Sequence, residues 1–283
     1  MNGVNGARAT RLGDGRLHCE HGPIDLLIEA WGEAGEVERA YAQARQRFEG
    51  ILDELVAELP ALRTPTGDAM PRFAGRVAQR MTAAVWPLRE VFVTPMAAVA
   101  GGVADDMLAA LVNGRRLTKA IVNNGGDIAL HLATGESLSA GLVADIADPA
   151  LDAGATIDAT SAVRGIATSG WRGRSQSLGI ADAVTVLARS AAAADAAATL
   201  IANAVDTDHP SILRAPARSL REDSDLGDRL VAVEVPPLPR ACIDQALAAG
   251  LACAERMRAQ GFIDSALLVL QGQHRGLHAA RSL

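Results

Sequence analysis

The amino-acid sequence predicts an α+β fold in which helices pack on a mixed or antiparallel sheet. Apolar residues recur at spacings of three and four in several stretches, and short apolar runs punctuated by glycine occupy the centre of the chain. These two kinds of segment are partly segregated and do not alternate regularly, which favours α+β. We find no repeat and no boundary that forces a second domain. Residues 1–283 are therefore expected to form one domain with a substantial core.

The N-terminal part predicts a hairpin followed by a long helix. Residues 16–31 alternate imperfectly between apolar and polar, with a break at Gly22-Pro23, and this pattern is typical of a strand or hairpin. Seven apolar residues between Val37 and Leu59 recur at helical spacing, so they lie on one face of an amphipathic helix that we expect to end at Pro60.

A loop and two further helices are expected next. Residues 62–72 contain two prolines and a glycine and predict a loop, and residues 73–85 resume helical spacing before Trp86-Pro87. Thr94-Pro95 can open another helix, which carries residues 97–106, because proline suits a first helical turn.

The centre of the chain predicts the sheet, with strands at 119–123, 127–133, 138–144, 156–160, 163–168 and 182–188. Ser190 can cap an alanine-rich helix that runs to about Val205, and the polar stretch 206–228 is expected to be a long loop. The pattern then predicts a strand over 230–235, a helix from Pro239 to Gln260 and a last strand over 265–270.

Two residues of the alanine-rich helix have the spacing of metal ligands. Asp195 and Thr199 lie four apart, so their carboxylate and hydroxyl share one face and can point at one hard cation such as Mg²⁺. The alternative is that the helix packs tightly on the sheet while Asp195 faces water.

Two glycine-containing runs predict exposed backbone N–H groups. Asn123-Asn124-Gly125-Gly126-Asp127 lies between two apolar runs and favours a tight hairpin turn. A second run, Thr168-Ser169-Gly170, precedes Arg172 and Arg174, and this combination can form a cradle for an anion such as phosphate. A solvated loop is the alternative for the second run. Trp171 within it could stack on a ligand ring or close the edge of the core.

Four runs in order carry a resemblance to a known family: 97–106, 123–127, 165–170 and 194–199. Their order and spacing resemble the ApbE-type fold, whose best-known members are magnesium-dependent FAD:protein FMN transferases. The resemblance covers residues 90–205 well and the flanks by order of elements. The family's His-Ile-Ile-Asp-Pro run after Ser-Gly is missing, and residues 175–182 stand in its place.

The resemblance implies roles for residues of all four runs. Asp195, Thr199 and the carbonyl of Ala100 are expected to hold Mg²⁺ beside a flavin diphosphate. The implied flavin-binding residues are Asn123, Gly125, Gly126, Thr168, Ser169, Gly170, Arg172, Arg174 and Asp106. Gly101 stands where the family has lysine, and Val103 stands where it has tyrosine. A small-residue helix packed close to a sheet explains residues 97–106 equally well.

The function expected from the resemblance is binding of FAD or FMN, with transfer of FMN from FAD to a threonine or serine of an acceptor protein. Asp182 and Asp127 are the nearby carboxylates, in motif order, that could activate the acceptor hydroxyl. The alternatives are a nucleotide-binding module without catalysis and a different small-molecule enzyme that uses the same cleft.

Composition argues against other classes of function. The 27 basic and 33 acidic residues are dispersed, with a net charge of −6, which disfavours nucleic-acid binding. The three cysteines form no Cys-x-x-Cys pair, the N-terminal 15 residues lack a signal-peptide core, and no apolar run is expected to reach the roughly 18–20 residues of a membrane span. We therefore expect a cytoplasmic protein without membrane contact, and a homodimer on base rates.

Overall fold

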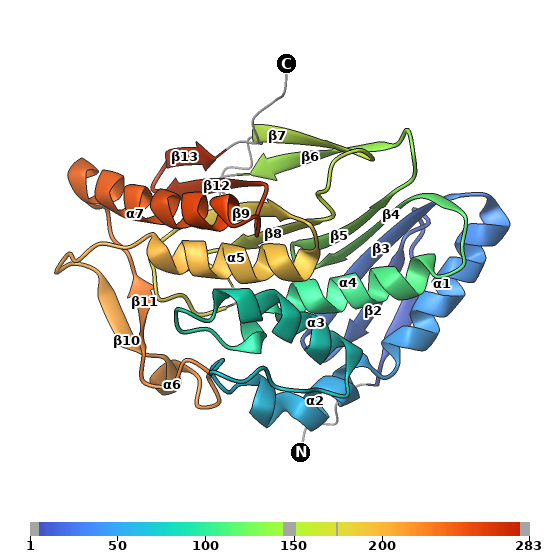
Figure 1. Cartoon of the computed structure of the whole chain (residues 1–283), viewed down its shortest axis with the longest axis horizontal. Coiled ribbons are helices and arrows are strands. Elements are labelled where there is room, and N and C mark those ends of the chain that lie inside the picture. Colours follow the sequence, from blue (N-terminus) through green and yellow to red (C-terminus); the bar gives the residue numbers. More distant parts are fainter. Residues whose placement is uncertain (1–5, 144–150, 174, 278–283) are drawn as a thin grey trace.

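The computed structural model describes residues 6–143, 151–173 and 175–277 and shows an α+β fold with a largely antiparallel sheet (Figure 1). Nine strands form the main sheet, in the order β1-β2-β3-β4-β5-β8-β9-β12-β13. Their bounds are β1 Arg8–Arg11, β2 Leu17–His21, β3 Ile24–Gly32, β4 Leu117–Asn124, β5 Asp127–Leu132, β8 Gly165–Ser169, β9 Ala183–Ala188, β12 Ser265–Leu270 and β13 Gln273–Leu277. Each neighbouring pair is antiparallel, and the predicted fold class is confirmed.

Helices cover the sheet in the order of the strands. Helix α1 (Ala34–Phe48) packs on β2 and β3, α4 (Val99–Val112) on β4 and β5, α5 (Ala191–Ala204) on β8 and β9, and α7 (Arg240–Ala259) on β12 and β13 (Figure 1). Outside this layer, α3 (Arg76–Val85) packs on α4, and α2 (Ile51–Leu62) packs on α3. The main apolar core lies between the sheet and these helices.

A smaller hairpin is inserted between β5 and β8, which pair directly with each other. It consists of β6 (Ser137–Val143) and β7 (Leu151–Asp158). Ile157 and partly buried Leu138 of this hairpin join a second apolar cluster with Leu130 and Ile166 of the main sheet.

Several predicted elements need correction. The single helix expected between Val37 and Leu59 is two helices, because Gly50 interrupts it, and the second continues past Pro60 to Leu62. The N–H of Arg63 donates to the Leu59 carbonyl at 3.0 Å, so a last helical turn forms across Pro60. The expected loop 206–228 contains β10 (Leu213–Pro216) and the short helix α6 (Ala217–Leu220), and β10 pairs with β11 (Leu230–Glu234).

The two edge strands β1 and β13 were not predicted. Their sequences, RATR and QHRGL, contain few apolar residues because edge strands of a sheet are largely exposed, so hydrophobic alternation gives no signal there. The two 3-10 helices Trp86–Leu88 and Pro95–Ala98 were also missed, and the second leads directly into α4.

One helical segment, Pro95–Val112, has the length and mean hydropathy of a membrane span. It includes Asp105 and Asp106, so it is not an uninterrupted apolar run. Half of it is buried inside the protein, where α4 contacts α1, α3 and α5. These contacts are those of a core helix.

The beginnings of α4 and α5 approach each other more closely than side chains allow. A Cβ atom added at Gly101 of α4 would lie 2.2 Å from the carbonyl oxygen of Ala191 in α5. A Cβ at Gly165 of β8 would lie 2.1 Å from the backbone of Ser190. Glycine at these two positions therefore sets how deeply the start of α5 can sit between α4 and the sheet.

We predict that Gly101→Ala lowers the free energy of unfolding by about 1–3 kcal/mol, because the added methyl group forces the helices apart. Chemical denaturation followed by circular dichroism measures this change. Gly67→Ala is the matched control, because a Cβ at Gly67 meets nothing within 4 Å, and it should shift stability by no more than about 0.5 kcal/mol. Equal stability of the two variants would contradict the close-packing argument.

Candidate functional site

Many of the predicted site residues that the structure describes lie at one end of the main sheet, whereas Asp106 contacts arginines of α1 and α3. Strand pairing places Asn124 opposite Asp127, and Ile128 opposite Ile166 near the start of β8, so the rest of β8 runs on past the beginning of β5. The start of β9 and the end of β12 meet at the same end through the pair Ala183 and Val269. The turn between β4 and β5, the loop after β8, and the turn between β12 and β13 therefore lie at a common edge.

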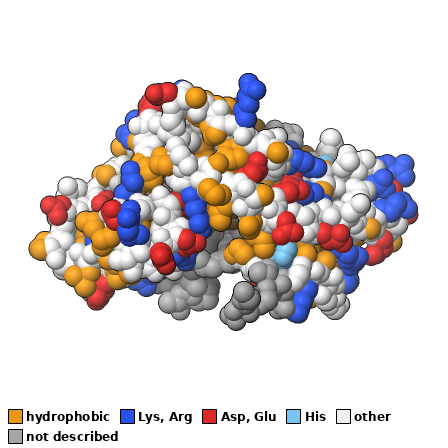
Figure 2. Space-filling model, turned by 90° about the horizontal axis from the view of Figure 1, so that it is seen from below, with side chains coloured by type: hydrophobic (Ala, Val, Ile, Leu, Met, Phe, Trp, Pro, Cys, Tyr) orange, Lys and Arg blue, Asp and Glu red, His pale blue; other side chains and the backbone are white. Residues whose placement is uncertain are grey.

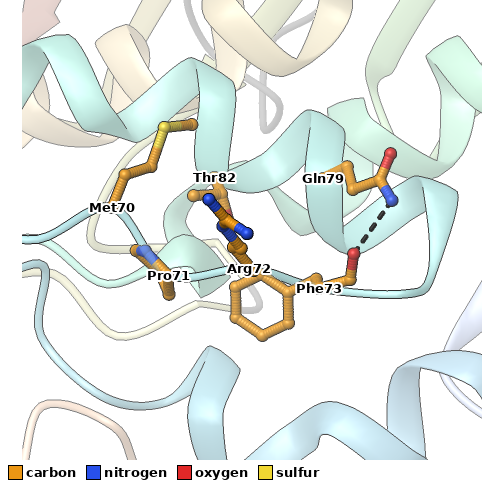
Figure 3. Close-up of a pocket in the computed structure, with 6 residues that line it drawn as sticks. All are labelled: Met70, Pro71, Arg72, Phe73, Gln79 and Thr82. Carbon is orange, nitrogen blue, oxygen red and sulfur yellow. Dashed lines mark hydrogen bonds between the residues drawn. The ribbon is translucent and has the colours of Figure 1, made fainter.

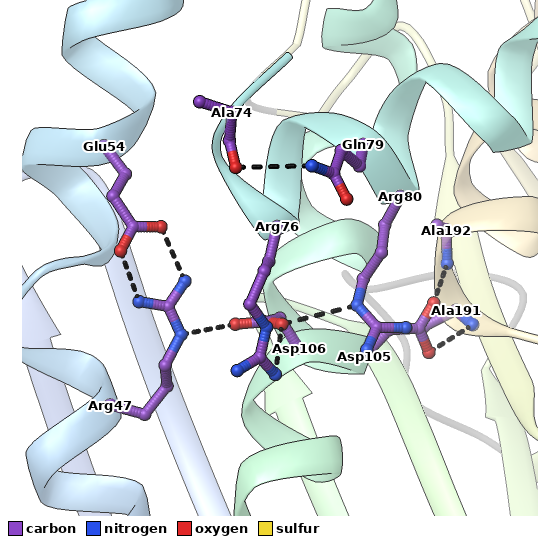
Figure 4. Close-up of polar contacts among 10 residues, drawn as sticks. All are labelled: Arg47, Glu54, Ala74, Arg76, Gln79, Arg80, Asp105, Asp106, Ala191 and Ala192. Carbon is purple, nitrogen blue, oxygen red and sulfur yellow. Dashed lines mark hydrogen bonds and ion pairs between the residues drawn. The ribbon is translucent and has the colours of Figure 1, made fainter. Parts of the chain in front are cut away.

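Helices α4 and α5 cap each other's first turns at this place. The N–H of Gly101 in α4 donates to Oδ2 of Asp195 in α5 at 3.0 Å, and the backbone of Ala100 also hydrogen-bonds to this carboxylate. In return, Asp105 of α4 accepts from the N–H groups of Ala191 and Ala192 at 3.0 and 2.9 Å (Figure 4). Each helix thus supplies the aspartate that satisfies free N–H groups of the other.

The pKa of the Asp195 carboxyl is perturbed by its surroundings. Burial raises its pKa well above the ordinary value, the nearby carboxylate of Asp127 raises it further, and the backbone groups of Gly101 and Ala100 act in the opposite direction. Burial also raises the pKa of Asp105. The approach of Asp195 to Asp127 brings the run at 194–199 together with the turn at 123–127, as expected.

Three oxygen groups belong to the predicted magnesium site. Asp195 and Thr199 lie one turn apart on α5, both partly buried, and the Ala100 carbonyl accepts from Nδ2 of Asn124 at 3.0 Å. Carboxylate, hydroxyl and carbonyl oxygens are the donors that Mg²⁺ prefers. Among the described residues no group of three or more histidine, cysteine or acidic side chains converges to hold a metal. Magnesium binding therefore stays a prediction.

The run Asn123 to Asp127 forms a two-residue hairpin turn between β4 and β5. Gly125 and Gly126 have φ values of 63° and 112°, which favour glycine, and the N–H of Gly126 donates to Oδ1 of Asn123 at 2.8 Å. The predicted hairpin is confirmed. Its lining of a flavin stays a prediction.

The loop after β8 is tied to neighbouring segments. The N–H of Thr168 donates to Oδ1 of Asp127 at 3.3 Å, and the Thr168 hydroxyl hydrogen-bonds to that of Thr185. Gly170 packs against the backbone of Asp182, where a Cβ would lie 2.3 Å from the carbonyl oxygen. Ser169, which precedes Gly170, is partly buried. Arg174 lies outside the described residues.

Asp182, which we expected near the acceptor, has its carboxylate engaged by three donors. Oδ1 accepts from Nε1 of Trp171 at 3.1 Å and forms an ion pair with Nε of Arg172 at 3.0 Å, and Oδ2 accepts from the N–H of Gln271 at 2.5 Å. Trp171 itself is partly buried against the main core. A role of Asp182 in proton transfer stays a prediction.

Asp106, which the resemblance implies to be a flavin residue, is fully buried among arginines (Figure 4). Oδ2 accepts from Nε of Arg47 at 2.6 Å, and Oδ1 lies 2.9 Å from Arg76 and 3.4 Å from Arg80. Arg47 is also bound by both oxygens of Glu54 at 2.7 Å. Asp106 therefore joins α4 to α1 and α3, and its contact with a flavin stays a prediction.

The two surface hollows described for this structure lie elsewhere. One, of about 510 Å³, is lined by Met70, Pro71, Arg72, Phe73, Gln79 and Thr82 (Figure 3). The other, of about 990 Å³, is bordered by α1, α2, α3 and α4 and includes Arg47, Glu54 and Arg76. Neither shares a residue with the predicted flavin and metal sites. Figure 2 shows acidic and basic side chains interspersed over the face seen from below.

Sequence reasoning missed two residues that organise this end of the sheet. Asp105 was passed over beside Asp106, although an aspartate in an otherwise small and apolar helix signals a buried polar contact. Gln271 has a φ of 47° in the turn before β13. The dipeptide Gln271-Gly272 directly after the apolar stretch 265–270 is a weak turn signal that could have located it.

This chain matches one family model and is similar in sequence to several known proteins. The family described as AbpE bacteria matches residues 8–276. A UPF0280 protein of Methanosphaerula palustris is 32% identical over 232 residues, 77% of this chain and 89% of that protein. Another, of Methanopyrus kandleri, is 36% identical over 66% of this chain and 72% of that protein.

Two further matches cover different shares of this chain and of the matched proteins. A UPF0280 protein of Methanothrix thermoacetophila is 38% identical over 157 residues, 53% of this chain, and the match spans 64% of that protein's length. Among solved structures, the apo form of the Pseudomonas stutzeri flavinyl transferase ApbE aligns with 99% of this chain and 96% of its own, with a TM-score of 0.45 and 14% sequence identity.

We predict that Asp106→Asn lowers the free energy of unfolding by about 3–5 kcal/mol, because it removes the buried negative charge that Arg47, Arg76 and Arg80 share, and Glu54 compensates only Arg47. Urea denaturation measures the loss. Asp223→Asn removes the partner of Arg63 at an exposed position and should cost no more than about 1 kcal/mol. A loss at Asp106 as small as that at Asp223 would show that the arginines rearrange toward solvent.

Proposed function

The chain belongs to the ApbE-like family described as AbpE bacteria, together with the UPF0280 proteins. On this premise we propose that it binds a flavin nucleotide, FAD or FMN, together with Mg²⁺. The proposed site lies at the end of the sheet where α4 and α5 cap each other. Transfer of FMN from FAD to a hydroxyl of an acceptor protein is the reaction class that this family membership favours.

The observation that carries the proposal is the meeting of three segments around Asp195. Its carboxylate contacts the first turn of α4, its neighbour Asp127 begins β5, and Thr199 follows one turn later on α5. Two buried carboxylates that raise each other's energy gain from a divalent cation between them and a phosphate. The oxygen donors of Asp195, Thr199 and Ala100 fit such an ion, which when bound would offset the charge of the diphosphate.

Different residues of the chain would then serve different roles in phosphoryl transfer. The acceptor oxygen forms a bond to the flavin-side phosphorus, the bond to the adenosine phosphate breaks, and the acceptor proton passes to a base. Asp127, whose carboxylate lies near that of Asp195, suits the last role by its place in the proposed site. The N–H of Gly126 donates to Oδ1 of Asn123, so of the two glycine N–H groups in the turn that of Gly125 would face a phosphate.

A nucleotide-binding module without catalysis is the second candidate, and Gly101 favours it. The family has lysine at this position, whereas here a Cβ would already lie 2.2 Å from the Ala191 carbonyl. The contact of α4 with α5 thus excludes any side chain there. Residues 175–182 also replace the family's histidine-containing run.

We predict that FAD binds more tightly with Mg²⁺ than with EDTA, and that Asp195→Asn abolishes this difference. An amide keeps the hydrogen-bonding shape but lacks the charge that a hard cation requires. Isothermal titration calorimetry measures both affinities, and circular dichroism checks that the variant is folded. Thr199→Val is the milder comparison. Failure of FAD, FMN and ADP to bind, with or without metal, would refute the proposal.

The rate of FMN transfer should separate the two candidates. We expect labelling of a standard threonine acceptor peptide to be slow or undetectable while nucleotide binding is retained, because losing one transition-state contact commonly lowers the rate by a factor of about 100 or more. Covalent flavin fluorescence on the acceptor after incubation with FAD and Mg²⁺ is the measurement. Rapid labelling that depends on Asp195 would establish the transferase and exclude the non-catalytic module.

A further inference from the structure

We propose that Asp182 is a positioning residue, which holds Trp171 and Arg172 together as a clasp for the ring and phosphate of a nucleotide. This inference rests on the proposed function and deepens it. It assigns Asp182 to ligand orientation and not to proton transfer, and it names an arginine–tryptophan pair as the part of the site that recognises an anionic, ring-bearing ligand.

The first step of the argument is the geometry around Asp182. Oδ1 accepts a hydrogen bond from Nε1 of Trp171 at 3.1 Å and forms an ion pair with Nε of Arg172 at 3.0 Å. The Arg172 guanidinium lies over the Trp171 ring, 5.1 Å from its centroid. One carboxylate oxygen therefore orients an indole and a guanidinium relative to each other, and their cation–π contact strengthens that arrangement.

The second step concerns the donors that remain. Asp182 uses only Nε of Arg172, and the terminal amino groups have no partner among the described residues. The Arg172 side chain is 57% exposed, whereas that of Asp182 is only 16% exposed. A guanidinium fixed at Nε from inside and open at its other edge presents a fork of N–H groups that matches phosphate oxygens.

The third step is the rigidity of the anchor. Oδ2 of Asp182 accepts from the N–H of Gln271, whose own amide joins the carbonyl of Pro236 and the N–H of Leu238. Gln271 adopts a φ of 47°, which a residue other than glycine keeps only when its surroundings hold it. The clasp is thus fixed to the turn between β12 and β13 and to the chain that leads into α7.

The place of the clasp links it to the proposed site. Trp171 and Arg172 follow Thr168, whose N–H donates to Asp127, within a loop that leaves β8 at the end of the sheet. The N–H of Trp171 donates to the Ala181 carbonyl at 2.9 Å, which closes the loop onto the start of β9. A nucleotide whose diphosphate lies by Asp127 can therefore extend toward this pair.

A double-mutant cycle with FAD as the probe tests the proposal. In the full-length protein with Mg²⁺, Asp182→Asn and Arg172→Gln should each weaken FAD binding about tenfold, and the double variant should bind no more weakly than either single variant. Non-additivity is expected because Asp182 acts through Arg172. Asp228→Asn is the matched control, since it breaks an exposed ion pair with Arg218 and should leave FAD affinity unchanged.

Arg172→Lys keeps the test decisive even if Asp182→Asn fails to fold. Lysine retains the charge but lacks the guanidinium nitrogen that Asp182 orients, so its FAD affinity should fall as far as that of Arg172→Gln. Full FAD affinity in Arg172→Lys, or additive losses in the cycle, would overturn the proposal. The dependence of affinity on salt should also weaken in Arg172→Gln, which removes the positive charge, if the guanidinium meets phosphate.

The failure of this inference is distinguishable from failure of the proposed function. If the wild-type protein binds neither FAD nor FMN, the proposed function fails. If FAD binds with the Mg²⁺ dependence that Asp195 confers, but its affinity ignores Arg172 and Asp182, only the clasp is refuted.

Discussion

The arrangement of this protein depends on the reciprocal capping of α4 and α5. Free N–H groups at the start of each helix carry partial positive charge, and burying two such ends side by side is unfavourable unless acceptors satisfy them. Asp105 and Asp195 satisfy them from opposite directions. The helices can approach closely only because Gly101 has no side chain. Asp195 and Ala100 of the proposed site take part in that contact, and Thr199 follows Asp195 one turn later on α5.

The same contact explains why one aspartate can serve two purposes. Asp195 stabilises α4 through the N–H of Gly101 and stands beside the buried Asp127. The hydrogen bonds favour its charged form, while burial and the neighbouring carboxylate oppose it. A residue held between these tendencies is suited to bind a cation or a proton, and the proposed Mg²⁺ site would use the first of these properties.

Much of this could be predicted from the sequence, because its signals are local. Glycine pairs located the turn at Gly125 and Gly126, and spacing placed Asp195 and Thr199 on one helical face. The break at Gly50 was missed because apolar spacing continues through it from α1 into α2. The engagement of Asp106 by arginines from α1 and α3 was also missed, since those residues lie 26 to 59 positions away in the chain and no periodicity records such contacts.

The pairing of β3 with β4 has a consequence for how the chain assembles. These neighbouring strands are separated by residues 33–116, which contain α1 to α4. Pairing across so long a stretch lowers chain entropy before it gains contacts, and such non-local topology is associated with slow folding. During synthesis the hairpin of β2 and β3 leaves the ribosome well before β4 does, so the edge of β3 that pairs with β4 stays unpaired until β4 has been made. Chaperone dependence is therefore expected to concentrate in the N-terminal third of this polypeptide.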